Sequence, residues 1–452
     1  MTKKIVILGA GPCGLAAAYQ LSKVKINEFE IFEKNSYPGG LCASFRDDKG
    51  FTWDTGGHVT FSDDLQVNEF LNDVMNNEWV CHKRDSFVHH KQKLIPFPFQ
   101  NNLRHLEPPI LLECVQGLLQ AKKQNKTPDN FKEWIENSYG QGIANHFMYP
   151  YNEKIWTYPL EEMDFLWTDE YVSQISINKT LENIILKKDD LTWGKNSRFK
   201  YPLKGGTGAI YSNASRHFKE KLHLNKQAVK VDSIKRIVHF QDGSTVNYDY
   251  LINTTPLNKL VKMLNDDFKD LVNASFELKY NSVLIVGIGI NRVQESVNKG
   301  SWFYFPDPEF PFYRVTLLSK YSLYNVPDIK TMASFLTEIS YSPETQIDKN
   351  ILIKKTIEKL KQISFISEKD TIETVFTKDV RMAYPVPTLN RNKSLRYILP
   401  RLEQLNIFSR GWFGSWIYEA SNMEKSIKQG FEAVDKILNF KTEVTLQKGL
   451  HL

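Results

Sequence analysis

Two short apolar runs near the start of the chain, residues 5–8 and 29–33, have the length and composition of buried β-strands. A segment that begins near Cys13 lies between them and predicts a helix. Strand, helix and strand in this order are typical of a βαβ unit with two parallel strands. The chain is therefore predicted to open with an α/β domain.

The rest of the chain shows first a helical and then a strand pattern. Apolar residues recur at helical spacing over about 108–156. One helix face there is expected to carry Ile110, Leu111, Cys114, Val115, Leu118 and Leu119. Strands are expected over about 229–254, with a turn at Asp242-Gly243, and runs within 283–340 predict an antiparallel sheet. A last helix with one core face is expected at about 424–438.

Composition narrows the class of protein. The chain has 452 residues, enough for two or three domains, and its 13% of aromatic residues suits a ligand pocket lined by rings. The net charge of +6 suits an anionic ligand, but no Lys/Arg run typical of nucleic-acid binders is present, so no nucleic acid is expected as a partner. The apolar start is too short for a signal peptide or a membrane span, so a cytoplasmic protein is expected.

The four cysteines are Cys13, Cys42, Cys81 and Cys114. They form no CxxC pair and no metal-ligand spacing, so no metal site is expected. Free thiols in a reducing compartment are the better interpretation.

The glycine-rich segment after the first strand, Gly9-Ala10-Gly11-Pro12-Cys13-Gly14, reads GxGxxG. Between a strand and a helix, such glycines allow a tight turn and a close approach of the backbone to a pyrophosphate, which the helix N-terminus attracts. Glu33 follows Gly14 by 19 residues, where a carboxylate can accept a hydrogen bond from a ribose hydroxyl. This pattern predicts dinucleotide binding, and a glycine-rich turn without a ligand is the alternative.

Two further glycine pairs indicate that the dinucleotide is FAD rather than NAD. They lie in Pro38-Gly39-Gly40-Leu41 and in Trp53-Asp54-Thr55-Gly56-Gly57-His58. Paired glycines after the second strand let the backbone lie against a long, extended cofactor. The arrangement resembles the amine oxidase and phytoene desaturase group of flavoproteins, and two ordinary surface turns are the alternative.

The fold expected from these patterns is α/β, with a Rossmann-type FAD-binding domain, an inserted helical domain and an antiparallel β-sheet domain. The FAD-binding parts are expected at 1–80, 196–270 and 391–452. The mainly helical insertion is expected at 81–195, and the antiparallel-sheet substrate domain at 271–390.

Eight segments, most of them rich in aromatic residues, carry a resemblance to a known family. They begin with GFTWDTGGHVTFS and IPFPFQNN, and lie at residues 50–62, 95–102, 147–156, 193–196, 201–211, 302–322, 384–389 and 411–422. Their sequences and their order resemble the eukaryotic-type UDP-galactopyranose mutases, over nearly the whole chain.

The resemblance implies an FAD-dependent isomerase that interconverts the pyranose and furanose forms of a nucleoside-diphosphate sugar, of the UDP-galactopyranose type. In that family N5 of the reduced flavin attacks the anomeric carbon and displaces the nucleoside diphosphate, without net redox. The protein positions the sugar nucleotide and holds the leaving diphosphate. NAD(P)H is a candidate reductant for the flavin, and the furanose product serves cell-surface polysaccharide biosynthesis.

The resemblance also implies roles for individual residues, for each of which an ordinary structural side chain is the alternative. The expected catalytic residues are His58 beside the flavin and, on the diphosphate, Arg314, Tyr321, Tyr384 and Tyr418. The expected substrate-binding residues are Phe97, Phe99, Gln100, Phe147, Asn152, Trp156, Tyr171, Asn196, Tyr304 and Asn422. The expected cofactor-binding residues are Gly9, Gly11, Pro12, Cys13, Gly14, Glu33, Lys34, Gly39, Gly40, Leu41, Gly57, His58, Val229, Gly414, Asn422, Met423 and Ser426.

Four places depart from the family pattern: Phe97, Asp63-Asp64, Tyr171 and Gly411-Trp412-Phe413. Tyr171 stands where the family commonly has a second diphosphate arginine, and a tyrosine hydroxyl donates one hydrogen bond without a charge. The sugar and the base are therefore open, with UDP-arabinopyranose, a dTDP-deoxyhexose and a GDP-heptose as alternatives. A flavin amine oxidase or desaturase and a non-catalytic flavin protein are the remaining hypotheses.

Overall fold

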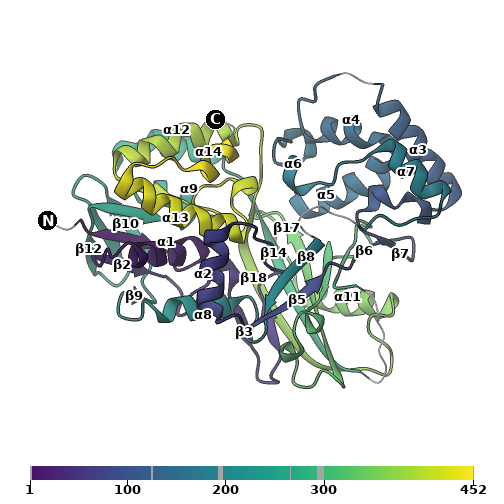
Figure 1. The fold of residues 1–452 in the computed structure, drawn as a ribbon, viewed down its shortest axis with the longest axis horizontal. Coiled ribbons are helices and arrows are strands. Elements are labelled where there is room, and N and C mark those ends of the chain that lie inside the picture. Colours follow the sequence, from purple (N-terminus) through teal and green to yellow (C-terminus); the bar gives the residue numbers. More distant parts are fainter. Residues whose placement is uncertain (1–2, 124–125, 192–196, 265, 293–299, 451–452) are drawn as a thin grey trace.

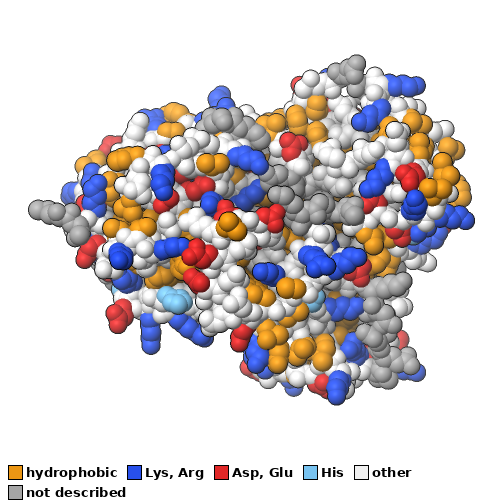
Figure 2. Space-filling model, viewed as in Figure 1, with side chains coloured by type: hydrophobic (Ala, Val, Ile, Leu, Met, Phe, Trp, Pro, Cys, Tyr) orange, Lys and Arg blue, Asp and Glu red, His pale blue; other side chains and the backbone are white. Residues whose placement is uncertain are grey.

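The computed structural model describes residues 3–123, 126–191, 197–264, 266–292 and 300–450. Figure 1 shows three regions: a parallel sheet with helices at the N-terminus, a helical region, and an antiparallel sheet between and below them. Among the described helices, none has the length and apolar character that a membrane crossing requires. Lys and Arg side chains alternate with Asp and Glu over the face seen in Figure 2.

The parallel sheet has five strands in the order β19-β13-β1-β2-β9. Their bounds are Ile407–Ser409, Tyr250–Asn253, Ile5–Leu8, Phe29–Phe32 and Leu222–His223. Every residue of β1 is buried, because its side chains alternate between two hydrophobic cores. The predicted βαβ start is confirmed, and its strands are joined in space by segments from the middle and the end of the chain.

Helices cover one face of this sheet, while small strands and further helices cover the other. The first face carries α1 (Pro12–Lys23), α2 (Leu65–Met75), α8 (Gly208–Arg216) and α13 (Met423–Asn439). The second carries β10 (Ala228–Asp232), β11 (Ile237–Phe240), β12 (Thr245–Asn247), α9 (Leu257–Met263), α10 (Lys269–Ala274), α12 (Arg391–Gln404) and α14 (Val444–Leu450). The expected turn joins β11 to β12, and Gly243 takes a φ of 83° there.

The antiparallel sheet has seven strands in the order β18-β14-β17-β16-β15-β6-β7. Their bounds are Thr371–Pro385, Tyr280–Asn291, Met332–Tyr341, Arg314–Leu317, Trp302–Tyr304, Ser86–His90 and Lys93–Pro96. One face packs against α11 (Lys349–Gln362), and the other packs against the helical region. β6 and β7 join this sheet by pairing β6 parallel to β15, although they lie within 81–195. The five domain ranges stay a prediction.

The helical region consists of α3 (Pro108–Ala121), α4 (Phe131–Ile143), the π-helical η4 (Ala144–Met148), α5 (Tyr149–Trp156), α6 (Thr168–Tyr171) and α7 (Ile177–Ile185). The predicted apolar face of α3 is wrong at Leu119, which is 45% exposed. A Cβ added to Gly117 would lie 2.9 Å from the backbone nitrogen of Gly142, so α3 and α4 touch through glycines. This close contact turns Cys114, Gly117 and Leu118 inward and leaves Leu119 outside.

Two small antiparallel pairs complete the strands. They are β3 (Ser44–Arg46) with β4 (Thr52–Asp54), and β5 (Trp79–Lys83) with β8 (Arg198–Pro202). The short helices that matter below are η1 (Gly40–Cys42), η2 (Phe99–Asn101), η9 (Leu318–Lys320) and η11 (Tyr418–Ala420). The turn after β4, residues 54–58, and the turn after β8, residues 203–208, lie next to each other.

Candidate functional site

The turn between β1 and α1 has the geometry that a pyrophosphate site needs. Gly9 has a φ of 103°, and a Cβ on Gly14 would lie 2.0 Å from the carbonyl oxygen of Gly9. Gly11 caps α1 without a side-chain hydrogen bond to the first helical amides. A Cβ on Gly40 would lie 3.5 Å from Cα of Gly11, so the two glycine turns face each other. The first backbone amides of α1 and the lack of side chains at these glycines suit an anion.

Glu33 stabilises this turn through hydrogen bonds to the backbone. Its carboxylate accepts hydrogen bonds from the backbone nitrogens of Ala10 and Asn35, both at 2.9 Å, and it is 5% exposed. Oε1 also accepts from Nδ2 of Asn35 at 2.8 Å, whereas Oε2, which accepts from Ala10, keeps a second lone pair for a ribose hydroxyl. The residue thus shapes the turn as well as offering a ligand contact.

The other predicted cofactor residues lie around the packed pair α1 and α13. Cys13 is buried against Gly411, whose added Cβ would lie 2.8 Å from Cβ of Cys13, and burial raises the pKa of its thiol. Asn422 caps α13 by accepting from the backbone nitrogen of Lys425 at 2.9 Å. Met423 is half-buried in the first turn of α13, and Ser426 donates to the carbonyl of Ser421 at 2.7 Å.

Four more predicted cofactor residues are placed as follows. Leu41 is half-buried within η1. Position 414 requires glycine, because a Cβ there would lie 2.0 Å from the carbonyl oxygen of Arg410. Lys34 is exposed after β2, and Val229 is 44% exposed at a β-bulge of β10. Their contact with a cofactor stays a prediction.

Arg314 and Glu338 form a buried charge pair on neighbouring strands of the antiparallel sheet. They are direct partners in the register of β16 and β17. Nη2 of Arg314 donates to Oε1 of Glu338 at 2.7 Å, and Nε donates to Oε2, so the contact is bidentate. The Tyr313 hydroxyl donates to the same carboxylate at 3.1 Å. Glu338 is 2% exposed and was not predicted from the sequence.

His58 lies against this pair because two glycines precede it. A Cβ on Gly56 would lie 3.1 Å from Cε1 of His58 and 3.4 Å from Oε1 of Glu338. Burial lowers the pKa of His58 to about 4, so its imidazole is neutral near neutral pH. Among the described residues, Nδ1 of His58 and Oγ1 of Thr316 are buried without a hydrogen-bond partner. Two orphaned polar atoms beside a charge pair indicate a ligand-binding surface.

The three predicted tyrosines converge on the same guanidinium. The Tyr384 hydroxyl is 3.2 Å from that of Tyr313, and the Tyr418 ring lies 5.0 Å from Trp156, edge to face. Burial raises the pKa of Tyr321, Tyr384 and Tyr418, while the nearby Arg314 charge opposes each shift. The hydroxyls therefore stay protonated and can donate to an anion.

Aromatic rings fill the predicted nucleotide pocket. Phe99 and Phe147 stack on each other with centroids 4.8 Å apart, and Phe97 lies 4.7 Å from Tyr304. Trp156 is buried within the same core. Base stacking on these rings stays a prediction.

The predicted amides are held by the backbone. Nε2 of Gln100 donates to the carbonyl of Ser173 at 2.9 Å, and Oε1 of Gln100 is buried without a partner among the described residues. Asn152 donates to the carbonyl of Met148 at 2.7 Å. Asn196, also predicted to bind substrate, lies outside the described residues.

Arg84 is a second arginine of this region that the sequence did not single out. Its Nη2 donates to the Tyr304 hydroxyl at 3.1 Å, and its guanidinium lies 5.0 Å and 4.9 Å from the rings of Phe97 and Trp302. Arg84 lies between β5 and β6, in a stretch without a recognisable motif. Its contacts place it beside the predicted nucleotide residues.

Three of the four departures from the family pattern lie around the tyrosine cluster. The rings of Tyr171 and Trp412 lie 5.2 Å and 5.5 Å from the Tyr418 ring, and Phe97 contacts Tyr304. Asp64 has a structural use, because it caps α2 by accepting from the backbone nitrogens of residues 66 and 67. Phe97, Tyr171 and Trp412 are therefore the departures that lie beside predicted ligand residues, and their contact with a ligand stays a prediction.

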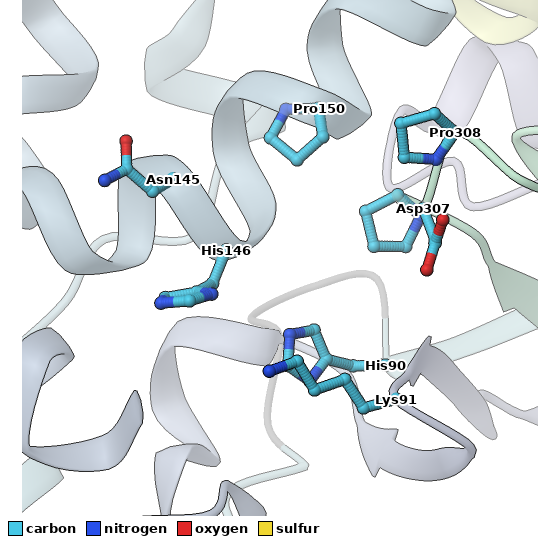
Figure 3. A pocket seen from close by; sticks show the side chains of 8 residues that line it. His90, Lys91, Asn145, His146, Pro150, Asp307 and Pro308 are labelled. Atoms are coloured by element: carbon cyan, nitrogen blue, oxygen red, sulfur yellow. The ribbon is translucent and has the colours of Figure 1, made fainter. Parts of the chain in front are cut away.

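A cavity of about 230 Å³ adjoins the predicted nucleotide-binding residues (Figure 3). It is lined by His90, Lys91, Asn145, His146, Pro150, Pro306, Asp307 and Pro308. The His146 ring points toward His90 at 6.0 Å and its Nε2 lies 2.8 Å from Oε2 of Glu113. The His90 ring is 5.7 Å from Phe99, so the cavity and the aromatic pocket share a wall.

Two comparisons with known proteins cover most of the chain. Residues 12–438 match the family described as flavin containing amine oxidoreductase. The fold is similar to the crystal structure of a reduced UDP-galactopyranose mutase, with a TM-score of 0.96 and 34% identity, over 99% of this chain and 97% of that one.

Two curated relatives match over shorter stretches. Protoporphyrinogen oxidase 2 of Arabidopsis thaliana is 25% identical over 33% of this chain, and coproporphyrinogen III oxidase of Staphylococcus aureus is 33% identical over 22%. The matched stretches span 32% and 22% of those two proteins.

Proposed function

Because this chain belongs to the UDP-galactopyranose mutase family of the flavin-containing amine oxidoreductases, we propose that it interconverts the pyranose and furanose forms of a UDP-sugar. Family membership confirms the predicted fold class, the FAD cofactor and the mutase-like enzyme type. The observation that carries the proposal is the buried Arg314–Glu338 pair with three protonated tyrosines around it.

The glycine turns fit FAD. Gly9, Gly11 and Gly40 leave room for a pyrophosphate at the N-terminus of α1, and Glu33 can accept from the ribose. Bound in this turn in its reduced form, FAD would supply a nucleophilic nitrogen, N5, for chemistry at the anomeric carbon. Neutral His58 offers its orphaned Nδ1 to a group at the flavin ring.

The remaining residues hold the nucleotide. Arg314 keeps donors for a diphosphate after its fork is fixed by Glu338, and the Tyr384 and Tyr418 hydroxyls donate beside it. Holding the leaving diphosphate matters twice, because the same group must re-attack to release the product. Oε1 of Gln100 is a buried acceptor suited to an N–H at the edge of a base such as uracil.

Galactose is the first sugar to test, and the alternative sugars are suggested by Tyr171, Trp412 and Phe97. These three residues change the donors around the pocket without touching the Arg314–Glu338 pair. The same reaction on UDP-arabinopyranose, a dTDP-deoxyhexose or a GDP-heptose uses the same machinery. We further propose NAD(P)H as the reductant and a cytoplasmic location, which four free thiols support.

The test is turnover by the reduced protein. The purified protein is expected to be yellow, and after reduction with dithionite it should convert UDP-galactopyranose to the furanose form, followed by chromatography of the nucleotide sugars. The oxidised protein should be inactive, since N5 is nucleophilic only when reduced. Stoichiometric oxidation of the flavin during turnover would favour an oxidase instead. Absence of conversion on the whole panel of four nucleotide sugars would overturn the proposal.

A further inference from the structure

Tyr313 is a buried tyrosine that lies between the Arg314–Glu338 pair and Tyr384. It is 1% exposed and directly precedes β16. Its backbone nitrogen donates to the carbonyl oxygen of Glu338 at 3.0 Å, and its hydroxyl donates to Oε1 of the same residue at 3.1 Å. The hydroxyl also lies 3.2 Å from that of Tyr384. Two hydrogen bonds to Glu338 therefore hold the Tyr313 oxygen beside Tyr384.

The direction of each hydrogen bond follows from the number of protons. A phenolic hydroxyl donates one hydrogen bond and can accept others. Burial raises the pKa of Tyr313 and of Tyr384, so each oxygen keeps its proton near neutral pH. Tyr313 gives its proton to Glu338, so Tyr384 is the donor between the two hydroxyls. Without a ligand, the Tyr384 hydrogen is thus directed to Tyr313.

One carboxylate therefore orients two of the predicted diphosphate donors. Glu338 accepts from Arg314 through both oxygens and reaches Tyr384 through Tyr313. Arg314 and Tyr384 lie on β16 and β18, which are separated by β17 and β14 in the sheet. The pairing of β14 with β18 is irregular next to Asn281, the register partner of Tyr384. The contact with Tyr313 therefore sets the distance between the two donors more closely than the sheet register does.

A bound diphosphate changes the balance between the two ends of this chain of hydroxyls. The Glu338 carboxylate is already neutralised by the guanidinium of Arg314, whereas a nucleoside diphosphate carries negative charge on both phosphoryl groups. The two hydroxyl bonds, at 3.1 Å and 3.2 Å, are longer than the usual distance of about 2.8 Å between hydrogen-bonded oxygens. A hydroxyl bond to a phosphate oxygen is charge-assisted and stronger than one between two neutral hydroxyls. The hydroxyl hydrogens should therefore turn toward the diphosphate.

We propose that Tyr313 is a positioning residue for the diphosphate, which acts through Tyr384. When the nucleotide binds, Tyr384 turns its hydrogen to a phosphate oxygen and Tyr313 turns its hydrogen from Glu338 to the Tyr384 oxygen. No proton leaves its oxygen, and Glu338 keeps both bonds from Arg314. Each hydroxyl in such a chain polarises the next, so donation by Tyr313 strengthens the contact of Tyr384 with the phosphate. The inference rests on the proposed function and adds a residue to that same site.

The test compares UDP with uridine, because only UDP carries the diphosphate. Dissociation constants for both are measured by calorimetry on the FAD-loaded protein with Tyr313→Phe, Tyr384→Phe, the double variant of these two, and the control Tyr341→Phe. Each change removes a hydroxyl and keeps the ring. Tyr341 is a matched control, because it is 6% exposed in β17 and donates its hydroxyl to the carboxylate of Asp379. It packs in the core on the other face of the same sheet.

Tyr313→Phe should weaken UDP binding about 3- to 10-fold and leave uridine within about 2-fold, the scale of one neutral hydrogen bond. Tyr384→Phe should weaken UDP binding about 10- to 100-fold, because the contact with the charged phosphate is itself lost. The double variant should bind UDP within about 2-fold of Tyr384→Phe, since Tyr313 acts through Tyr384. Tyr341→Phe should change neither affinity.

Unchanged or tighter UDP binding in Tyr313→Phe would overturn the inference, and so would an equal loss for UDP and uridine, which indicates a structural role. Losses that add in the double variant would also decide against it, because Tyr313 would then act independently of Tyr384. If Tyr313→Phe retains no flavin, Tyr384→Phe decides, and unchanged UDP affinity there would refute the inference. A wild-type protein that binds UDP no better than uridine would instead refute the proposed function.

Discussion

Removing the Arg314–Glu338 pair in two steps should separate stability from activity. Single substitutions Arg314→Met and Glu338→Met each leave one charge buried without its fork. The double substitution Arg314→Met/Glu338→Met leaves none. Because a lone buried charge is costly and a well-packed apolar pair is not, the two single variants should be less stable than the double variant.

The magnitudes follow from the geometry. Glu338 is 2% exposed and bonded through both oxygens, so losing Arg314 should cost about 3–5 kcal/mol of unfolding free energy. The double variant should return to within about 1–2 kcal/mol of the wild type. Activity should not return, since the diphosphate has then lost its arginine. We expect kcat/KM to fall roughly 10²- to 10⁴-fold in both variants that lack Arg314, which corresponds to a loss of about 3–5 kcal/mol of transition-state stabilisation.

The assay is a double-mutant cycle read twice, once by urea midpoints at saturating FAD and once by kcat and KM of the reduced enzyme. The coupling free energy in stability should be several kcal/mol, while the variants lacking Arg314 should share one activity loss. A double variant as unstable as the sum of the singles would refute the charge-burial reasoning. Recovery of activity in the double variant would refute the role of Arg314 on the diphosphate.

Three further predictions are open to test. Glu33→Ala should weaken FAD retention by about 1–3 kcal/mol, with Glu33→Gln intermediate, and equal FAD affinity by absorbance titration would contradict this. Burial lowers the pKa of His58 to about 4, so between pH 4 and 6.5 the unfolded chain binds more protons and stability falls as the pH falls. Between pH 7 and pH 5 this linkage amounts to about 2 kcal/mol, which His58→Asn should remove from the difference in unfolding free energy measured by urea at the two pH values; an unchanged difference would count against it. Tyr171→Arg should keep or improve turnover of UDP-galactose if that is the native sugar, and should damage the native reaction if Tyr171 makes room for another one.

The parts of the fold that the sequence predicted are those with local signals. The strand before Gly9, the helix after it and the turn at Gly243 each have a pattern within a few residues. Leu119 was misplaced because the face of α3 is decided by Gly117 and its contact with α4. The prediction from helical spacing considered only apolar residues. The buried face of α3 is instead set by Gly117, whose missing side chain allows the close contact with α4.

The candidate site divides in the same way. The sequence predicted His58, Arg314 and the three tyrosines, because each lies in a motif that resembles a known family. Glu338 could not be, since its partner is 24 residues away and the antiparallel register that joins them is set by the whole sheet. Arg84 likewise meets Tyr304 through a tertiary contact.

This division explains why the reaction type is easier to infer than the sugar. Arg314 and Glu338 depend on each other, because changing either one leaves a buried charge, so the diphosphate anchor resists single substitutions. Tyr171 and Trp412 are uncharged: the Tyr171 hydroxyl donates to the carbonyl of Glu419 at 3.4 Å, and Nε1 of Trp412 donates to that of Ala383 at 2.8 Å. A substitution at either position leaves no charge buried without its partner. We therefore expect substitutions at Arg314 or Glu338 to cost more stability than substitutions at Tyr171 or Trp412, because only the former leave a charge buried without its partner.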